Sequence, residues 1–186
     1  MANHWTTLVS IILGLGMADL LVNLHRLIHA RARVDWDALP LAWAAIALCW
    51  MFNYWWAVGA GLDGAPNARV VGHYVLLAIN PIVLFLLSAS ILPRSLPREG
   101  RLDMRAEWDG NRTTCLYLFA LNQLVTWCMV IAARGGVFWD FPAITRTVTL
   151  ALVVAALVFR SRRVEWGVVA VIAAFMVARL ATQAVR

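Results

Sequence analysis

Six long apolar segments occupy most of this chain, and they limit its fold more than any other feature. They cover approximately residues 5–29, 36–61, 70–92, 113–133, 142–159 and 164–184. Each approaches or exceeds the length that a helix needs to cross a hydrocarbon layer of about 30 Å. Because hydrocarbon offers no hydrogen-bond partner to backbone groups, such segments must be helical. The sequence therefore predicts an all-α, polytopic integral membrane protein, a bundle of six transmembrane helices.

The composition leaves no room for a separate soluble domain. The 186 residues are 62% hydrophobic and only 14% charged, and the longest polar stretch is the connection 93–112. We expect one transmembrane domain over residues 1–186, with 93–112 as a cytoplasmic loop and the lipid bilayer as the main partner.

The basic residues are all arginine, and the net charge is +6. Because they stand in short connections beside apolar segments, they are better explained by membrane orientation than by nucleic-acid binding, so we expect no nucleic-acid partner. The absence of lysine excludes a lysine nucleophile or Schiff base. An arginine-only set also favours a bacterial host with a GC-rich genome.

Alternate connections differ sharply in arginine content. The first, third and fifth connections hold eleven of the sixteen arginines, namely Arg26, Arg31, Arg33, Arg94, Arg98, Arg101, Arg105, Arg112, Arg160, Arg162 and Arg163. Arginine-rich connections stay in the cytoplasm. The sequence thus predicts a protein of the bacterial inner (plasma) membrane with both termini in the periplasm.

An Arg-x-acid-Trp pattern occurs in the same three connections, and its tryptophans are Trp36, Trp108 and Trp166. The acid suits a helix N-terminus, and tryptophan suits the membrane interface, so all three are expected interface anchors. Two interpretations stay open at this point. Either the chain is built of three tandem helix hairpins in a 2+2+2 arrangement, or the pattern recurs because each cytoplasmic helix start independently favours an arginine, an acid and an interfacial tryptophan.

Asp19 is the strongest candidate for a functional residue, because a carboxylate within an apolar helix is costly unless it has partners or is protonated. Asp19, Asn23 and Arg26 share one face of the predicted helix, at 100° per residue. His25 and His29 form a neighbouring stripe with i, i+4 spacing. Metal binding by this histidine pair is disfavoured because no third ligand stands nearby in the sequence.

Further polar residues lie at similar depth in other segments: Asn80, Asn122 and Gln123, with Asn53 somewhat closer to the outside. Pro81 follows Asn80 and frees the carbonyl of Leu77, four residues earlier, from its helical hydrogen bond. Such a kinked helix can line a cavity, although polar residues of this kind also serve to hold helices together.

We therefore expect binding or passage of a small solute, proton or cation through a polar midplane site of Asp19, Asn23, Asn80, Asn122 and Gln123. His25, Arg26, His29 and Asn53 are secondary candidates. The alternative is a non-catalytic accessory subunit of a larger membrane complex, and an intramembrane enzyme comes third because no nucleophile–base pair is visible. The sequence identifies no cofactor and predicts no metal site. It leaves open a homo-oligomer or a complex with another membrane protein.

The predicted orientation is testable with topology reporters. A reporter that is active only in the periplasm should be active when fused after Arg186, and it should be silent when fused within residues 94–105, because the arginine-rich connection stays in the cytoplasm. The opposite pattern of activity would invert the topology.

Overall fold

The structure, a computed structural model, is an almost entirely helical chain; it describes residues 2–61, 71–97, 100–134, 136 and 139–184. The elements, in chain order, are α1 (Ala2–His29), a 3-10 turn (Arg31–Arg33), β1 (Val34–Asp35), α2 (Ala38–Gly61), α3 (Val71–Ile91), β2 (Leu102–Asp103), α4 (Met104–Arg134), α5 (Phe141–Phe159) and α6 (Arg162–Ala184). Apart from α4, the helices begin and end within a few residues of the predicted segments.

α4 begins at Met104 rather than near residue 113, so part of the predicted loop 93–112 is helical. The cause is the residue before the helix. Asp103 Oδ1 accepts hydrogen bonds from the backbone amides of Arg105 at 2.9 Å and Ala106 at 3.1 Å. A carboxylate in this place satisfies amides that have no partner inside the helix, and it starts the helix well before the apolar run.

The short pairing of β1 with β2 was not expected from the sequence. The two strands are parallel, with Val34 opposite Leu102 and Asp35 opposite Asp103. Val34 and Leu102 are both buried, and Arg101 forms an ion pair of 2.6 Å with Asp35. The first and third connections are therefore joined into one unit. We call the end of the bundle that carries β1, β2 and the α5–α6 turn the basic end.

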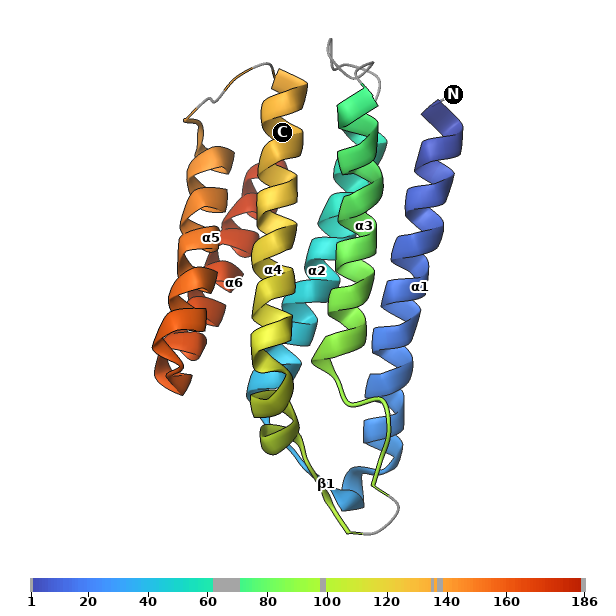
Figure 1. The fold of residues 1–186 in the computed structure, drawn as a ribbon, viewed down its shortest axis with the longest axis vertical. Coiled ribbons are helices and arrows are strands. Elements are labelled where there is room, and N and C mark those ends of the chain that lie inside the picture. Colours follow the sequence, from blue (N-terminus) through green and yellow to red (C-terminus); the bar gives the residue numbers. More distant parts are fainter. Residues whose placement is uncertain (1, 62–70, 98–99, 135, 137–138, 185–186) are drawn as a thin grey trace.

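The helices form a bundle in which α3 lies between α1 and α4, with α2 packed behind them (Figure 1). α5 packs on α4, and α6 packs on α5 and α2. The beginning of α1 and the end of α6 lie at the same end of the bundle, opposite the basic end. This arrangement places the arginine-rich connections together.

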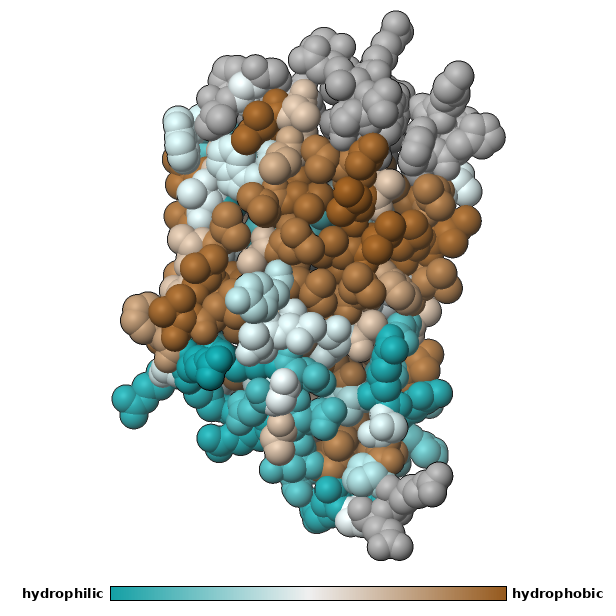
Figure 2. Space-filling model, in the orientation of Figure 1, coloured by the Kyte–Doolittle hydropathy of each residue, from teal (hydrophilic) through white to brown (hydrophobic). Residues whose placement is uncertain are grey.

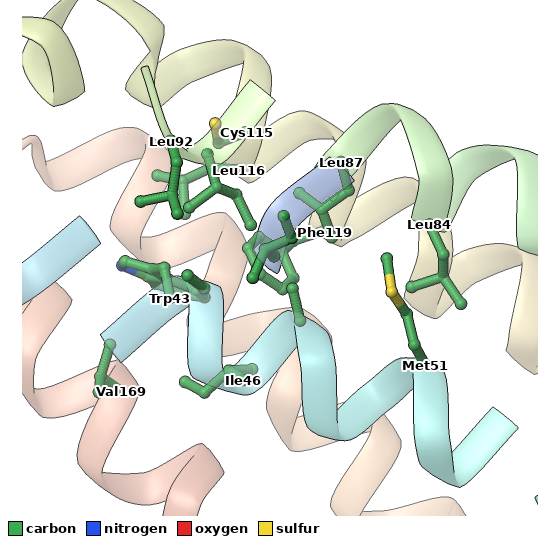
Figure 3. Close-up of a cluster of buried hydrophobic side chains, with 14 of the residues drawn as sticks. Trp43, Ile46, Met51, Leu84, Leu87, Leu92, Cys115, Leu116, Phe119 and Val169 are labelled. Carbon is green, nitrogen blue, oxygen red and sulfur yellow. The ribbon is translucent and has the colours of Figure 1, made fainter. Parts of the chain in front are cut away.

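The core contains side chains of all six helices, and its largest rings come from α2 and α4 (Figure 3). The Phe119 ring lies 4.6 Å from that of Trp43 and 5.0 Å from that of Trp50, measured between centroids. Gly16 allows α1 to approach this core, because a Cβ atom there would lie 3.1 Å from Met51 Cε and 3.2 Å from Ser88 Oγ. Small residues permit such close helix contacts in membrane proteins.

The outer surface is apolar over a broad band and hydrophilic at the basic end (Figure 2). Large apolar side chains are exposed on every helix, among them Ile11, Trp56, Ile82, Leu124, Val158 and Val177. Within the residues that the structure describes, three apolar segments are long enough to cross a membrane: Thr6–His29 of α1, Ala38–Val58 of α2 and Met104–Ala132 of α4. α3 and α5 carry shorter apolar stretches. The described part of the chain is thus a helical bundle with three membrane-compatible helices.

The three Arg-x-acid-Trp copies do not occupy equivalent places. Trp36 precedes α2, whereas Trp108 and Trp166 each lie in the first turns of α4 and α6. Trp36 and Trp166 are 42% and 40% exposed, but Trp108 is 2% exposed. The sequence predicted Trp108 as an interface anchor, whereas its side chain is buried inside the bundle. It is a core residue, because its indole stacks on Trp43 with ring centroids 6.3 Å apart.

A buried arginine attaches the α5–α6 hairpin to α4. The Arg112 guanidinium donates hydrogen bonds to Glu165 Oε1 and to the carbonyl of Ala156, and Trp108 Nε1 donates to Glu165 Oε2 at 3.0 Å. The positive charge thus meets the C-terminal end of α5, and the carboxylate stands in the first turn of α6. Both placements suit the helix dipoles.

The ion pair of Arg112 with Glu165 should dominate the stability of this hairpin. Arg112→Met should lower the free energy of unfolding by about 3–5 kcal/mol, because it leaves the buried Glu165 side chain without its arginine partner. Combining it with Glu165→Leu should recover part of that loss. The measurement is unfolding in mild detergent.

The exposed pair of Arg101 with Asp35 provides the control. Arg101→Gln should cost no more than about 1 kcal/mol, because solvent screens exposed ion pairs. An equal cost for Arg101→Gln and Arg112→Met would contradict the role of the buried pair.

Candidate functional site

Asp19 stands on α1 with its side chain 31% exposed, and it has two polar neighbours. Asn23 Nδ2 donates a hydrogen bond to Asp19 Oδ2 at 3.3 Å, as the i, i+4 spacing predicted. Arg94 Nη2 lies 3.5 Å from the same oxygen. Arg94 was not among the predicted site residues. Its position just after α3 places it beside the second half of α1, because both helices run toward the basic end, but no sequence signal distinguishes it from the other arginines of that connection.

A second contact holds the segment after α3 against α1. Arg26 Nη1 donates a hydrogen bond to the carbonyl of Arg94 at 3.4 Å. The rings of His25 and His29 lie beside this contact, exposed and stacked with centroids 6.3 Å apart. Among the described residues, no group of three histidine, cysteine or acidic side chains could hold a metal ion.

Asn80 and Asn122 form a separate, buried amide pair. Asn122 Nδ2 donates to Asn80 Oδ1 at 2.8 Å, and Asn80 Nδ2 donates to Thr126 Oγ1 at 3.3 Å. The Thr126 hydroxyl in turn donates to the carbonyl of Asn122 at 2.8 Å. These bonds join α3 to α4 through neutral groups alone. The sequence placed both asparagines at this depth, but it did not show that they bind each other.

The carbonyl freed by Pro81 is also satisfied. The Tyr54 hydroxyl of α2 donates a hydrogen bond to the carbonyl of Leu77 at 3.0 Å. This is the carbonyl that Pro81 was predicted to free from its helical hydrogen bond. The acceptor is used by a neighbouring helix, because Tyr54 is buried against α3.

Gln123 and Asn53 take no part in this network. Gln123 is buried and Asn53 is partly exposed, and within the described chain neither forms a hydrogen bond with Asn80, Asn122 or Asp19. Gln123 follows Asn122 directly, so the two side chains leave α4 about 100° apart. Sequence neighbours on a helix do not share a face.

The predicted single polar site is therefore two clusters. Gly16 of α1 lies against Phe85 of α3. Asp19 is three residues from Gly16 toward the basic end, and Asn80 is five residues from Phe85 toward the other end. At 1.5 Å per residue, Asp19 and Asn80 are about 12 Å apart along the bundle. The error in the prediction was to assign them the same depth.

Asp37 is a charged group at the basic end that sequence reasoning missed. Its Oδ1 atom accepts a hydrogen bond from the amide of Leu39 at 3.0 Å, which caps α2, and its carboxylate pairs with Arg162 at the start of α6. Burial by itself raises the pKa of Asp37. The hydrogen bonds from Arg162 and Leu39, with the charges of Arg162 and Arg105, outweigh burial and hold the pKa below its ordinary value.

Stability should depend on pH through Asp37. A carboxyl whose pKa is lowered by folding stabilises the protein above its unfolded pKa, and it loses this effect as pH falls through the folded value. The difference in unfolding free energy between the protein and Asp37→Asn should be constant near neutral pH and should shrink below the ordinary pKa of 3.8. Denaturation at a series of pH values measures this difference.

Asp103→Asn is the matched control, because Asp103 also caps a helix but its carboxylate pairs with no arginine guanidinium among the described residues. The difference in unfolding free energy between Asp103→Asn and the native protein should vary less with pH than the difference for Asp37→Asn. If the two differences depended on pH in the same way, pairing with Arg162 would not be the cause of the pH dependence.

The two clusters differ in what they can do chemically. The Asp19 cluster holds a partly exposed carboxylate beside a guanidinium, so it can exchange a proton or a cation. The Asn80–Asn122 cluster holds neutral groups that already bind one another, so it can join helices. Comparison of this chain with protein-family models, curated proteins and solved structures finds no match.

Proposed function

We propose that the chain is a six-span protein of the bacterial inner membrane, with periplasmic termini, that binds a proton or small cation at Asp19. The apolar stretches 75–91 of α3 and 143–159 of α5 support the additional spans, since they approach the length that crosses a bilayer. α6 packs along α5 and α2 and completes the bundle. The concentration of arginine at the basic end supports the orientation.

The state of Asp19 is the observation that carries this proposal. Its carboxylate is neither fully buried nor tightly paired, because the 3.5 Å separation from Arg94 exceeds the 2.7–2.9 Å of a strong charge-assisted bond. Arg94 is itself 57% exposed. A cation that displaced Arg94 would leave the guanidinium in solvent rather than unpaired in the core. Exchange at Asp19 therefore has a small electrostatic cost.

Arg94 also explains why the site suits an exchange of partners. Its backbone is held to α1 by Arg26, whereas its side chain reaches back toward Asp19. The segment can thus stay in place while the guanidinium moves. Asn23 is buried and hydrogen-bonded to Asp19, so it holds the carboxylate in position during the exchange.

A second candidate function is that of a non-catalytic subunit of a larger membrane complex. It is favoured by the hydrogen bonds among Asn80, Asn122 and Thr126. These bonds join α3 to α4, which is a structural role. In this case Asp19 and Arg94 also serve only to fix α1 against α3. The partner would be another membrane protein or a second copy of the chain.

Replacement of Asp19 separates the two functions. Asp19→Asn keeps the shape and the contact with Asn23 but removes the charge, so the fold should persist while proton exchange is lost. The measurement is proton uptake into sealed vesicles that hold the purified protein and a pH-sensitive dye. Uptake by the Asp19→Asn variant should fall to that of protein-free vesicles.

Two controls make the result specific. Glu107→Gln removes an exposed carboxylate at the same end and should leave uptake unchanged. Asn122→Leu should lower the free energy of unfolding by about 0.6–1.7 kcal/mol without abolishing uptake, because it removes only an interhelical hydrogen bond. Equal uptake by the native protein and Asp19→Asn would favour the accessory-subunit function.

A further inference from the structure

The turn between α5 and α6 exposes two arginines together with large apolar side chains. Arg160 and Arg163 are exposed, and neither has an ion-pair or hydrogen-bond partner for its side chain in the part of the chain that the structure describes. Phe159 is 68% exposed and Trp166 is 40% exposed. Arg162, between them, differs because it pairs with Asp37.

The position of this turn sets it apart from the other basic connections. The first and third connections extend past the helices to β1 and β2, whereas the end of α5 and the start of α6 stop short of them (Figure 1). In the same view, the apolar band gives way to hydrophilic surface at about the level of this turn (Figure 2). In a membrane, its side chains would lie at the depth of the lipid headgroups.

Local structure does not account for the two arginines. Arg160 follows the last residue of α5 with φ +41°, a left-handed conformation in which glycine is the favoured residue. Arg163 is the second residue of α6, where the helix dipole disfavours positive charge. Arg163 and Trp166 are three residues apart, so they share a face of α6. A cation on this face therefore sits next to an exposed aromatic ring.

We propose that the α5–α6 turn binds the headgroup of an anionic glycerophospholipid in the cytoplasmic leaflet. Arg160 and Arg163 pair with its phosphate, which guanidinium groups recognise through two parallel hydrogen bonds. Phe159 and Trp166 pack at the headgroup boundary, where aromatic residues accumulate. The assignment of leaflet rests on the proposed membrane orientation, but it is independent of cation binding at Asp19.

Lipid binding can be measured on the full chain by native mass spectrometry with phosphatidylglycerol as the probe. The double variant Arg160→Gln/Arg163→Gln should bind phosphatidylglycerol about fivefold more weakly for each arginine removed. Arg31→Gln/Arg105→Gln loses the same charge from exposed positions elsewhere at the basic end, and it should bind nearly as well as the native protein. An equal loss in both double variants would show only a general charge effect and would overturn the site.

Arg160→Gly separates lipid binding from a role in folding. Glycine relieves the left-handed strain, so the variant should have a higher melting temperature than the native protein in nanodiscs of phosphatidylcholine. Addition of phosphatidylglycerol should raise the melting temperature of Arg160→Gly less than it raises that of the native protein. A lower melting temperature in phosphatidylcholine, with an unchanged gain from phosphatidylglycerol, would show that Arg160 serves the fold instead.

Two further measurements complete the test. Inorganic phosphate added to phosphatidylcholine nanodiscs should not reproduce the stabilisation, and an equal effect would overturn the assignment to a lipid. The reporter fusions decide the orientation separately. Periplasmic activity of a fusion within residues 94–105 would overturn the cytoplasmic leaflet while leaving the lipid measurements valid.

Discussion

The buried guanidinium of Arg112 holds the α5–α6 hairpin to α4. It reaches from α4 to the carbonyl of Ala156 at the end of α5 and to Glu165 at the start of α6. Without it, the Glu165 carboxylate would keep only the hydrogen bond from Trp108, and the carbonyl of Ala156 would lose the bond from Arg112, in a place that water hardly reaches. Removing one partner of a buried ion pair lowers stability far more than replacing the whole pair with apolar residues does. The three helices are therefore held in one arrangement.

Polar groups in this protein are sorted by charge along the bundle. Neutral amides and hydroxyls, such as Asn80 and Asn122, pair with one another where the surrounding surface is apolar. Charged groups, such as Asp19, Asp37 and Glu165, pair with arginines nearer the basic end. The sorting follows from desolvation, because an unpaired charge costs more than an unpaired amide. Of these three carboxylates, Asp19 is the most exposed, with 31% of its side chain accessible.

Sequence reasoning anticipated part of the candidate site and missed the rest for one physical reason. The spacing of Asp19 and Asn23, and the carbonyl that Pro81 frees at Leu77, follow from the geometry of a single helix, and both are present in the structure. Arg94 comes from another segment, and its choice among neighbouring arginines depends on the level at which α3 ends beside α1. Tyr54 reaches Leu77 only because α2 packs on α3 with a particular rotation.

The sequence by itself determined the helical segments, the arginine-rich end and the face of α1 that carries its polar residues, because these depend on composition and on local periodicity. Only the tertiary structure decided that Glu165 is buried while Glu107, at the same place in an identical motif, is exposed. The motif fixes each acid near a helix start, but the neighbouring helices decide which acid meets a buried arginine. Rotation and relative height of helices arise from packing among distant segments, which no local pattern records.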